Sequence, residues 1–298
     1  METHKITTYI IGVGLLLASC VKDDLYNTPH PDKGAVQITT DWTGHSSDAV
    51  LPDSYILRLG SEEQTVSGET NAFNALFAPG KQDLLVYHQA QGITVSGNIA
   101  TVNTLSDGTL EPMPDYLFSG VKGLDIIKDD TLKVTVPMQQ QIRQLALSLK
   151  LNPGDEQRIA GTSATLTGIA SAIDLTTGTL AATGGKAIVP TFTLGTDGGQ
   201  PQTNNRRTRA TGQPTLAATM RLLGVITGER QILTLVVTLT NGSVQTITGD
   251  LTDALKNFGS ADMEPLLLDA TLKLPVAGEI GGTITGWTEV NNGNITIH

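Results

Sequence analysis

The sequence predicts an all-β protein built of antiparallel β-sandwiches, with one or two short helices. Apolar and polar residues alternate with period two in runs from one end of the chain to the other, the pattern of strands with one buried face and one solvated face. Glycine, proline and asparagine separate these runs at turn positions. Hydrophobic residues make up 39% of the chain but aromatic residues only 4%, so the cores must consist mainly of aliphatic side chains.

The first 19 residues resemble the signal peptide of a bacterial lipoprotein. An apolar run from Ile6 to Leu17 ends in Ala18-Ser19-Cys20, which places small residues before the single cysteine of the chain. As a helix this run would span about 18 Å, against roughly 30 Å for a hydrocarbon core, so we expect cleavage rather than a transmembrane anchor. The resemblance implies a covalent lipid such as palmitate on Cys20 and no other cofactor. The alternative is an ordinary free thiol.

Residues 20–33 are predicted to form a lipidated tether. Lys22-Asp23-Asp24 resembles the tag that follows the lipid cysteine in surface-exported lipoproteins of Bacteroidetes-type bacteria, although these charges could also be a plain solvated spacer. Pro29 and Pro31, with few apolar neighbours, indicate an extended segment. We therefore expect the protein in the cell outer membrane, lipid-anchored and facing outside.

The strand pattern is clearest in four runs. The first places Val36, Ile38 and Trp42 on one face, and the others are Leu145–Leu151, Leu233–Leu239 and Leu266–Leu274. The threonines between the apolar residues suit the solvated face of a pleated sheet.

Turn and helix signals punctuate the strands. Asn241-Gly242 predicts a hairpin because both residues tolerate positive φ, and Pro79-Gly80, Pro153-Gly154 and Asn292-Gly293 mark further turns. Asp250 is expected to cap one helix over Leu251–Phe258, which Gly259 would end. A second short helical turn is expected within Asn71–Phe77.

The mature chain is long enough for two domains. Asp129–Pro137 has the pattern of a closing strand, and a new strand pattern begins near Ile142. We predict an N-terminal sandwich over residues 34–137 and a C-terminal sandwich over residues 138–298. Gly195–Pro214, which contains Arg206, Arg207 and Arg209, is expected to be an exposed loop open to trypsin-like proteases. The formal net charge of −10 argues against nucleic acid as a partner.

The sequence contains no recognisable catalytic or metal-binding motif. The histidines after the signal are not spaced as ligands, and calcium loops, phosphate-binding glycine loops and nucleophile elbows do not occur. A carboxylate pair for glycoside hydrolysis could come from Asp53, Glu62, Glu63, Asp125, Asp129 and Asp130, but acidic residues in turns are usually just solvated. We expect no enzyme, no metal and no small-molecule substrate.

Two side chains have competing interpretations. His88 is expected at a strand end facing water, with a role in a site as the alternative. Trp287 is expected to anchor the end of a sandwich from inside, and the alternative is an exposed ring that stacks on a sugar.

Taken together, these features resemble the fimbrillin-associated anchor subunits of Bacteroidales type V fimbriae. The resemblance rests on the lipid cysteine with its tag, Asp41-Trp42, the 77–88 segment, Val136-Pro137-Met138, the 166–170 segment and Gly286-Trp287-Thr288. It implies two tandem transthyretin-like domains, no enzymatic activity, and a structural anchor role in a cell-surface fimbria that contributes to adhesion. The implied partners are other fimbrial subunits and, through the lipid, the outer membrane. A stalk or tip lipoprotein would share many of these features.

The position of the first arginine after Cys20 favours an anchor. Stalk subunits offer an early arginine to an activating protease, whereas here Arg58 lies inside the strand-like run Tyr55–Leu59. The alternative class is a surface glycan-binding lipoprotein of a nutrient-uptake system, which should present several exposed aromatic rings. Two tryptophans, five tyrosines and five phenylalanines leave little material for such a platform.

The C-terminal residues continue the strand pattern. Thr283–Val290 and Ile295–His298 are expected to form the closing hairpin of the second sandwich around Asn292-Gly293. The alternative is a strand donated to a neighbouring subunit, in which Ile284, Val290, Ile295 and Ile297 would dock.

Overall fold

The computed structural model describes residues 32–180, 184–196, 212–259, 262–276 and 281–290, and its regular structure is almost entirely β-strand. The predicted all-β sandwich class is therefore confirmed. The helical elements in these ranges are one 3-10 turn, Asp155–Arg158, and one short helix, α1, Thr252–Leu255.

The first sandwich stacks a three-stranded sheet, β4-β1-β9, on a five-stranded sheet, β10-β8-β5-β2-β3. Alternation along β1 buries Val36 and Ile38 completely, and β2 buries Tyr55, Leu57 and Leu59 in the same way. The strands are β1 Ala35–Asp41, β2 Tyr55–Leu59, β3 Glu62–Val66, β4 Thr70–Ala72, β5 Gly80–Tyr87, β8 Phe118–Ile126, β9 Thr131–Pro137 and β10 Gln139–Gln140.

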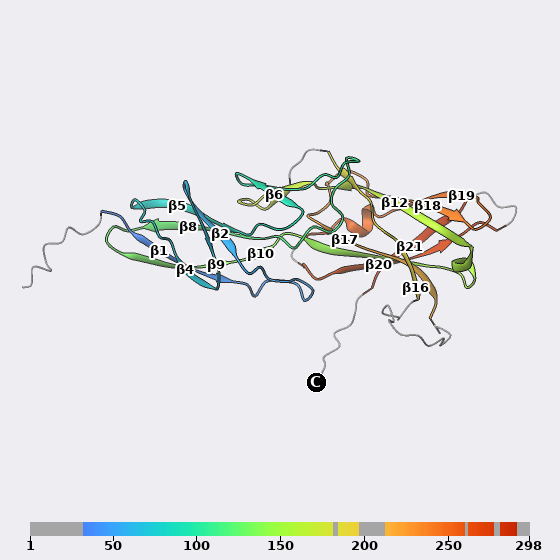
Figure 1. Ribbon diagram of the computed structural model, residues 1–298, viewed down its shortest axis with the longest axis horizontal. Helices are drawn as coiled ribbons and strands as arrows, with labels where there is room; N and C mark the ends of the chain where they lie inside the picture. The colour runs from blue at the N-terminus through green and yellow to red at the C-terminus, as the bar shows by residue number, and fades with distance from the viewer. Residues whose placement is uncertain (1–31, 181–183, 197–211, 260–261, 277–280, 291–298) are drawn as a thin grey trace, which may run out of the picture.

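The second sandwich stacks β16-β17-β11-β20-β21 on β15-β12-β18-β19, and Figure 1 shows it following the first along the long axis of the molecule. Leucines on the inner faces of β11, β18 and β20 are buried, as the sequence predicts. The strands are β11 Arg143–Lys150, β12 Ile159–Ile169, β15 Lys186–Ile188, β16 Thr193–Thr196, β17 Pro214–Leu222, β18 Ile232–Leu239, β19 Val244–Asp250, β20 Leu266–Lys273 and β21 Thr283–Glu289.

Two strand pairings are parallel, which the alternation did not predict. β1 pairs with β9 over seven positions, from Ala35↔Thr131 to Asp41↔Pro137, and β11 pairs with β20 over six. A period-two pattern reports only which face of a strand is buried. Whether a neighbour runs parallel depends on a crossover of a dozen or more residues, which the local pattern does not reveal.

A further sheet, formed by two hairpins, joins the two halves of the chain. Strands β6 Ile93–Ser96 and β7 Ile99–Val102 come before Pro137, and β13 Ala172–Asp174 and β14 Thr179–Leu180 come after it. They form one sheet in the order β14-β13-β7-β6, with Ile173 opposite Ala100. The division at Pro137 remains a prediction, but β-structure crosses it.

The hairpin at Asn241-Gly242 is confirmed, with Gly242 at φ +85° between β18 and β19. The predicted helix is too long: α1 ends at Leu255, although Leu251, Leu255 and Phe258 are buried and Gly259 has the expected positive φ. Asp250 accepts hydrogen bonds from the Thr252 backbone N–H (3.0 Å) and hydroxyl (2.5 Å) and so starts a turn rather than a long helix. The prediction of a helical turn within Asn71–Phe77 is wrong, because Asn71 and Ala72 belong to β4 and pair with β1.

Candidate functional site

The acidic and histidine side chains of the described residues do not gather into a metal-binding group. These residues contain no group of three or more His, Cys, Asp or Glu side chains that could hold a metal ion. Glu63 forms an ion pair with Arg58, and the ring of His45 meets the Trp42 carbonyl oxygen at 2.7 Å. No helix within the described ranges is long and apolar enough to cross a membrane.

Several predicted residues lie outside the described ranges. They are the lipidation site Cys20, the tag Lys22, Asp23 and Asp24, and the C-terminal Ile295 and Ile297, together with His30, His298 and the Arg206, Arg207 and Arg209 segment. The lipid, the export tag and the donated strand stay predictions.

Backbone hydrogen bonds hold the chain on both sides at the point where it enters the first sandwich. Gly34 exchanges two backbone hydrogen bonds of 2.9 Å with Phe77, and the Ala35 N–H donates to the Asp130 carbonyl at 2.9 Å. A side chain at Gly34 would collide with the backbone, because a Cβ there would lie 2.3 Å from the Ile127 oxygen. The segment that leads from Cys20 is therefore secured where it reaches the fold.

The parallel pairing of β1 and β9 suits a tension-bearing connection. The chain enters at the N-terminal end of β1, and the C-terminal end of β9, at the opposite end of the strand pair, continues toward β11 of the second sandwich. Opposite pulls on these two ends slide the strands past each other, so their ladder hydrogen bonds are loaded together rather than opened one at a time.

The two sandwiches are joined by a polar junction. Glu264 accepts hydrogen bonds from the Ser47 backbone N–H (2.9 Å) and hydroxyl (2.6 Å), and its carbonyl oxygen accepts from Arg143 Nε at 2.6 Å. Arg143 is buried, and its guanidinium lies 5.6 Å from the ring centre of Phe258. These residues are 121 to 217 positions apart, so no local sequence signal could have identified them.

A second cluster supports the same junction. The Arg221 guanidinium stacks 4.2 Å from the ring centre of Tyr116 and donates to the Pro114 carbonyl at 3.3 Å. The Tyr116 hydroxyl donates to Asp48. Burial, followed by this hydrogen bond to Asp48, raises the pKa of Tyr116 to about 12. The phenol thus stays protonated and donates to Asp48, which ties the 42–50 loop to the ring that Arg221 of β17 covers.

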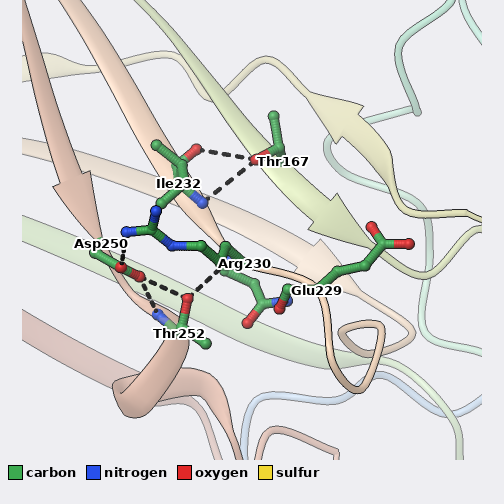
Figure 2. A network of polar contacts seen from close by, with 7 residues as sticks. Thr167, Glu229, Arg230, Ile232, Asp250 and Thr252 are labelled. Carbon is green, nitrogen blue, oxygen red and sulfur yellow. Dashed lines mark hydrogen bonds and ion pairs between the residues drawn. The ribbon is translucent and has the colours of Figure 1, made fainter.

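Polar contacts also close the loop between β17 and β18 (Figure 2). Arg230 forms an ion pair with Asp250 (2.5 Å), and the Thr252 hydroxyl accepts from the Gln231 backbone N–H at 3.0 Å. Hydrogen bonds from Thr252 and then from Arg230 lower the pKa of Asp250 to about 2. The carboxylate is solvent-exposed, so the cluster orders a loop rather than forming a reactive centre.

His88 is buried, so the expectation that it faces water is wrong. The residues that cover it come from the 116–118 segment, which the alternation of β5 cannot reveal. Its Nδ1 accepts the Phe118 backbone N–H at 3.3 Å, and only 7% of the residue is exposed. Burial, the largest effect, lowers the pKa of His88 below its ordinary value.

We expect this buried imidazole to make stability fall as the pH falls below about 6.5. The unfolded chain takes up a proton near pH 6.5, whereas the folded chain resists it because a charged Nδ1 would lose its hydrogen bond. Urea unfolding between pH 7.5 and 5.5 measures this effect. His88→Gln should flatten the pH dependence and His45→Gln, in the exposed loop, should not; equal slopes for the wild type and His88→Gln would contradict it.

Trp287 packs against the core of the second sandwich but is only half-buried, so the buried interpretation is met in part. A Cβ on Gly249 of β19 would lie 3.2 Å from the indole, so the missing side chain makes room for the ring. The indole is half-buried against the core, and its N–H is buried with no hydrogen-bond partner among the described residues. Trp42, the other tryptophan, makes edge contacts with Tyr55 and Phe118. Both rings are therefore used in packing.

The structure places the first part of the predicted donor segment within the chain's own fold. Ile284 is 9% exposed and lies opposite Leu272 of β20. Val290 donates its N–H to the Leu267 carbonyl at 2.9 Å, beside the start of β20 and near the junction. The described part of the chain stops at Val290, so Ile295 and Ile297 lie outside it.

Comparisons with known proteins give a consistent result. A family model described as fimbrillin-A associated anchor proteins Mfa1 and Mfa2 matches residues 26–293. The fimbrial anchor protein Mfa2 from Porphyromonas gingivalis has the same fold, with a TM-score of 0.56 and 8% identity over 86% of this chain and 97% of that one. A candidate adhesin from Bacteroides ovatus superposes with a TM-score of 0.56 and 14% identity over 89% and 97% of the two chains. No curated protein sequence matches significantly.

Proposed function

Because this chain belongs to the family of fimbrillin-A associated anchor proteins, we propose that it fastens a fimbria to the outer membrane through a lipid on Cys20. Family membership makes the chain an anchor subunit of a cell-surface fimbria, a structural role in adhesion with fimbrial subunits as partners. The lipid, the outer-membrane location, the outward orientation and the lack of enzymatic activity are our proposals. The match of the family model over residues 26–293 is the observation that carries the anchor role, and Ala18-Ser19-Cys20 followed by Lys22-Asp23-Asp24 supports the lipid and the location.

The arrangement of the described residues supports an anchor that bears load. Backbone hydrogen bonds with Phe77 and Asp130 hold the chain where it enters β1. This strand lies between β4 and β9 in the interior of its sheet. Arg58 lies in β2, which pairs on both sides with β3 and β5, so cutting there would break the interior of a sheet. This supports an N-terminal strand that is retained.

Cys20→Ala is expected to abolish acylation and release filaments from the cell. Loss of the thiol removes the attachment point of the lipid, and the described residues contain no helix long and apolar enough to span a membrane in its place. Metabolic labelling with a palmitate analogue should mark the wild type only, and filaments should move to the medium in the variant. Full labelling of Cys20→Ala, or filaments that stay attached to its cells, would refute the proposed function.

Replacement of Lys22, Asp23 and Asp24 by alanine is expected to change the side of the membrane on which the protein lies, without changing its lipidation. If these residues are an export tag, the triple variant should still take up label but become protected from added protease in intact cells. A matched replacement of Asp32 and Lys33 by alanine should remain protease-accessible. Unchanged accessibility of the triple variant would leave residues 22–24 as a spacer.

A further inference from the structure

Strand β19 ends its sheet with one edge unpaired within the described part of the chain. It is last in the order β15-β12-β18-β19 and pairs with β18 over seven positions without a register shift. Leu239 donates to the Ser243 carbonyl and Leu251 to the Gln231 carbonyl, each at 2.8 Å. Antiparallel hydrogen bonding alternates along a strand, so the N–H and C=O groups of Val244, Thr246 and Thr248 point away from β18.

This edge lacks the devices that protect the other long edge strands. β9 carries Lys133 and ends at Pro137, β3 begins with Glu62 and Glu63, and β21 is interrupted by a bulge at Gly286, whose φ is +75°. Charges, prolines and bulges of this kind keep sheet edges from pairing with other chains. From Val244 to Gly249, β19 has none of them, and its one charged residue, Asp250, stands at the end of the strand and pairs with Arg230.

The edge lies at the end of the molecule opposite to the start of β1, as Figure 1 shows. Beside it is a cleft of about 560 Å³, lined by Arg158, Leu239, Ser243, Gln245, Pro275 and Val276. Val276 is 57% exposed and gives the cleft an apolar rim, and Val244, at the start of β19, is 58% exposed. A strand laid along β19 could place an apolar side chain in this cleft while its backbone pairs with the edge.

The core of the second sandwich is already filled next to β19. The Trp287 ring lies against Gly249, and a Cβ on Gly282 would lie 2.5 Å from the side chain of Ile247. An incoming strand therefore has no vacant core position to fill. It would extend the four-stranded sheet as a fifth strand rather than replace one of its members.

We propose that β19 is the edge to which the neighbouring fimbrial subunit adds an extended, uncharged β-strand. The inference rests on the proposed function, which puts the membrane at the β1 end and the filament at the far end. Main-chain hydrogen bonds to Val244, Thr246 and Thr248 supply the affinity, and the cleft at Val276 fixes the register. A neutral edge favours an uncharged strand because no side chain of Val244–Gly249 offers an ion pair.

Thr246→Pro tests the backbone pairing directly. The Thr246 side chain is exposed and its N–H points outward, so proline removes an edge donor without breaking a bond to β18. A second variant, Thr246→Lys with Thr248→Lys, blocks the edge by charge. Thr65→Lys, on exposed edge strand β3, is the matched control. We expect about tenfold fewer attached filaments in both edge variants and no change in the control, with lipid labelling and surface exposure retained.

Filaments that stay attached in both edge variants would overturn the proposal. A photo-reactive phenylalanine at position 246 of the full chain, expressed in its own cells, identifies the occupant. The expected cross-link joins position 246 to an extended, uncharged segment of another fimbrial subunit. A cross-link to residues 291–298 of the same chain or to a second copy would refute it. If Cys20→Ala releases filaments and the edge variants do not, only this inference fails; if Cys20→Ala retains them, the proposed function itself fails.

Discussion

Deletion of residues 283–298 is expected to unfold the second sandwich, whereas deletion of residues 291–298 is expected to leave it folded. The longer deletion removes all of β21, including Ile284 and Trp287, and uncovers β20. Loss of a buried Ile or Trp side chain costs about 2–5 kcal/mol each, and a domain is stable by only about 5–15 kcal/mol. Circular dichroism melts and limited proteolysis of the two truncated proteins measure the difference.

The shorter deletion also separates the two interpretations of the C-terminus. If residues 291–298 are donated, the truncated protein should remain folded, lipidated and surface-exposed while filaments are shed. If they complete a hairpin with β21, filaments should stay attached and only local stability should fall. A cooperative melt of the 283–298 deletion at the wild-type temperature would contradict the core role of β21.

Gly168→Ala is expected to destabilise the second sandwich by about 3 kcal/mol. Gly168 has φ +75°, which costs an L-residue about 1–2 kcal/mol, and a Cβ there would lie 2.7 Å from the Arg230 carbonyl oxygen. Backbone cannot give way cheaply, so overpacking adds about 1–3 kcal/mol. The side chain of Arg230 also forms the ion pair with Asp250 that closes the β17–β18 connection (Figure 2).

Gly228→Ala is the matched control for this prediction. It lies in the β17–β18 loop, at φ +85°, but nothing is within 4 Å of its Cβ position, so only the backbone cost of about 1–2 kcal/mol applies. Urea unfolding of the wild type and the two variants measures the difference in free energy of unfolding. Equal losses for both variants would mean that the contact with Arg230 is relieved without cost.

Alternation in the sequence determined which side chains form the cores. Val36 and Ile38 in β1, and the leucines of β11, β18 and β20, are buried as predicted, since burial of every second residue follows from the pleat alone. Asn241-Gly242 and Gly259 were equally predictable, because positive φ is a local property of the residue. The family resemblance, carried by motifs at both ends of the chain, was also present in the sequence.

The tertiary structure decided everything that depends on residues far apart in the chain. Parallel pairing of β1 with β9, the sheet shared by β7 and β13, the burial of His88, and the Ser47–Glu264 junction follow from how the sheets stack. The exposure of Val244–Gly249 in β19 as an edge without charged side chains is of the same kind. A strand pattern fixes its own faces, but its neighbours are chosen by long-range packing, so only the folded chain shows which edges remain unpaired.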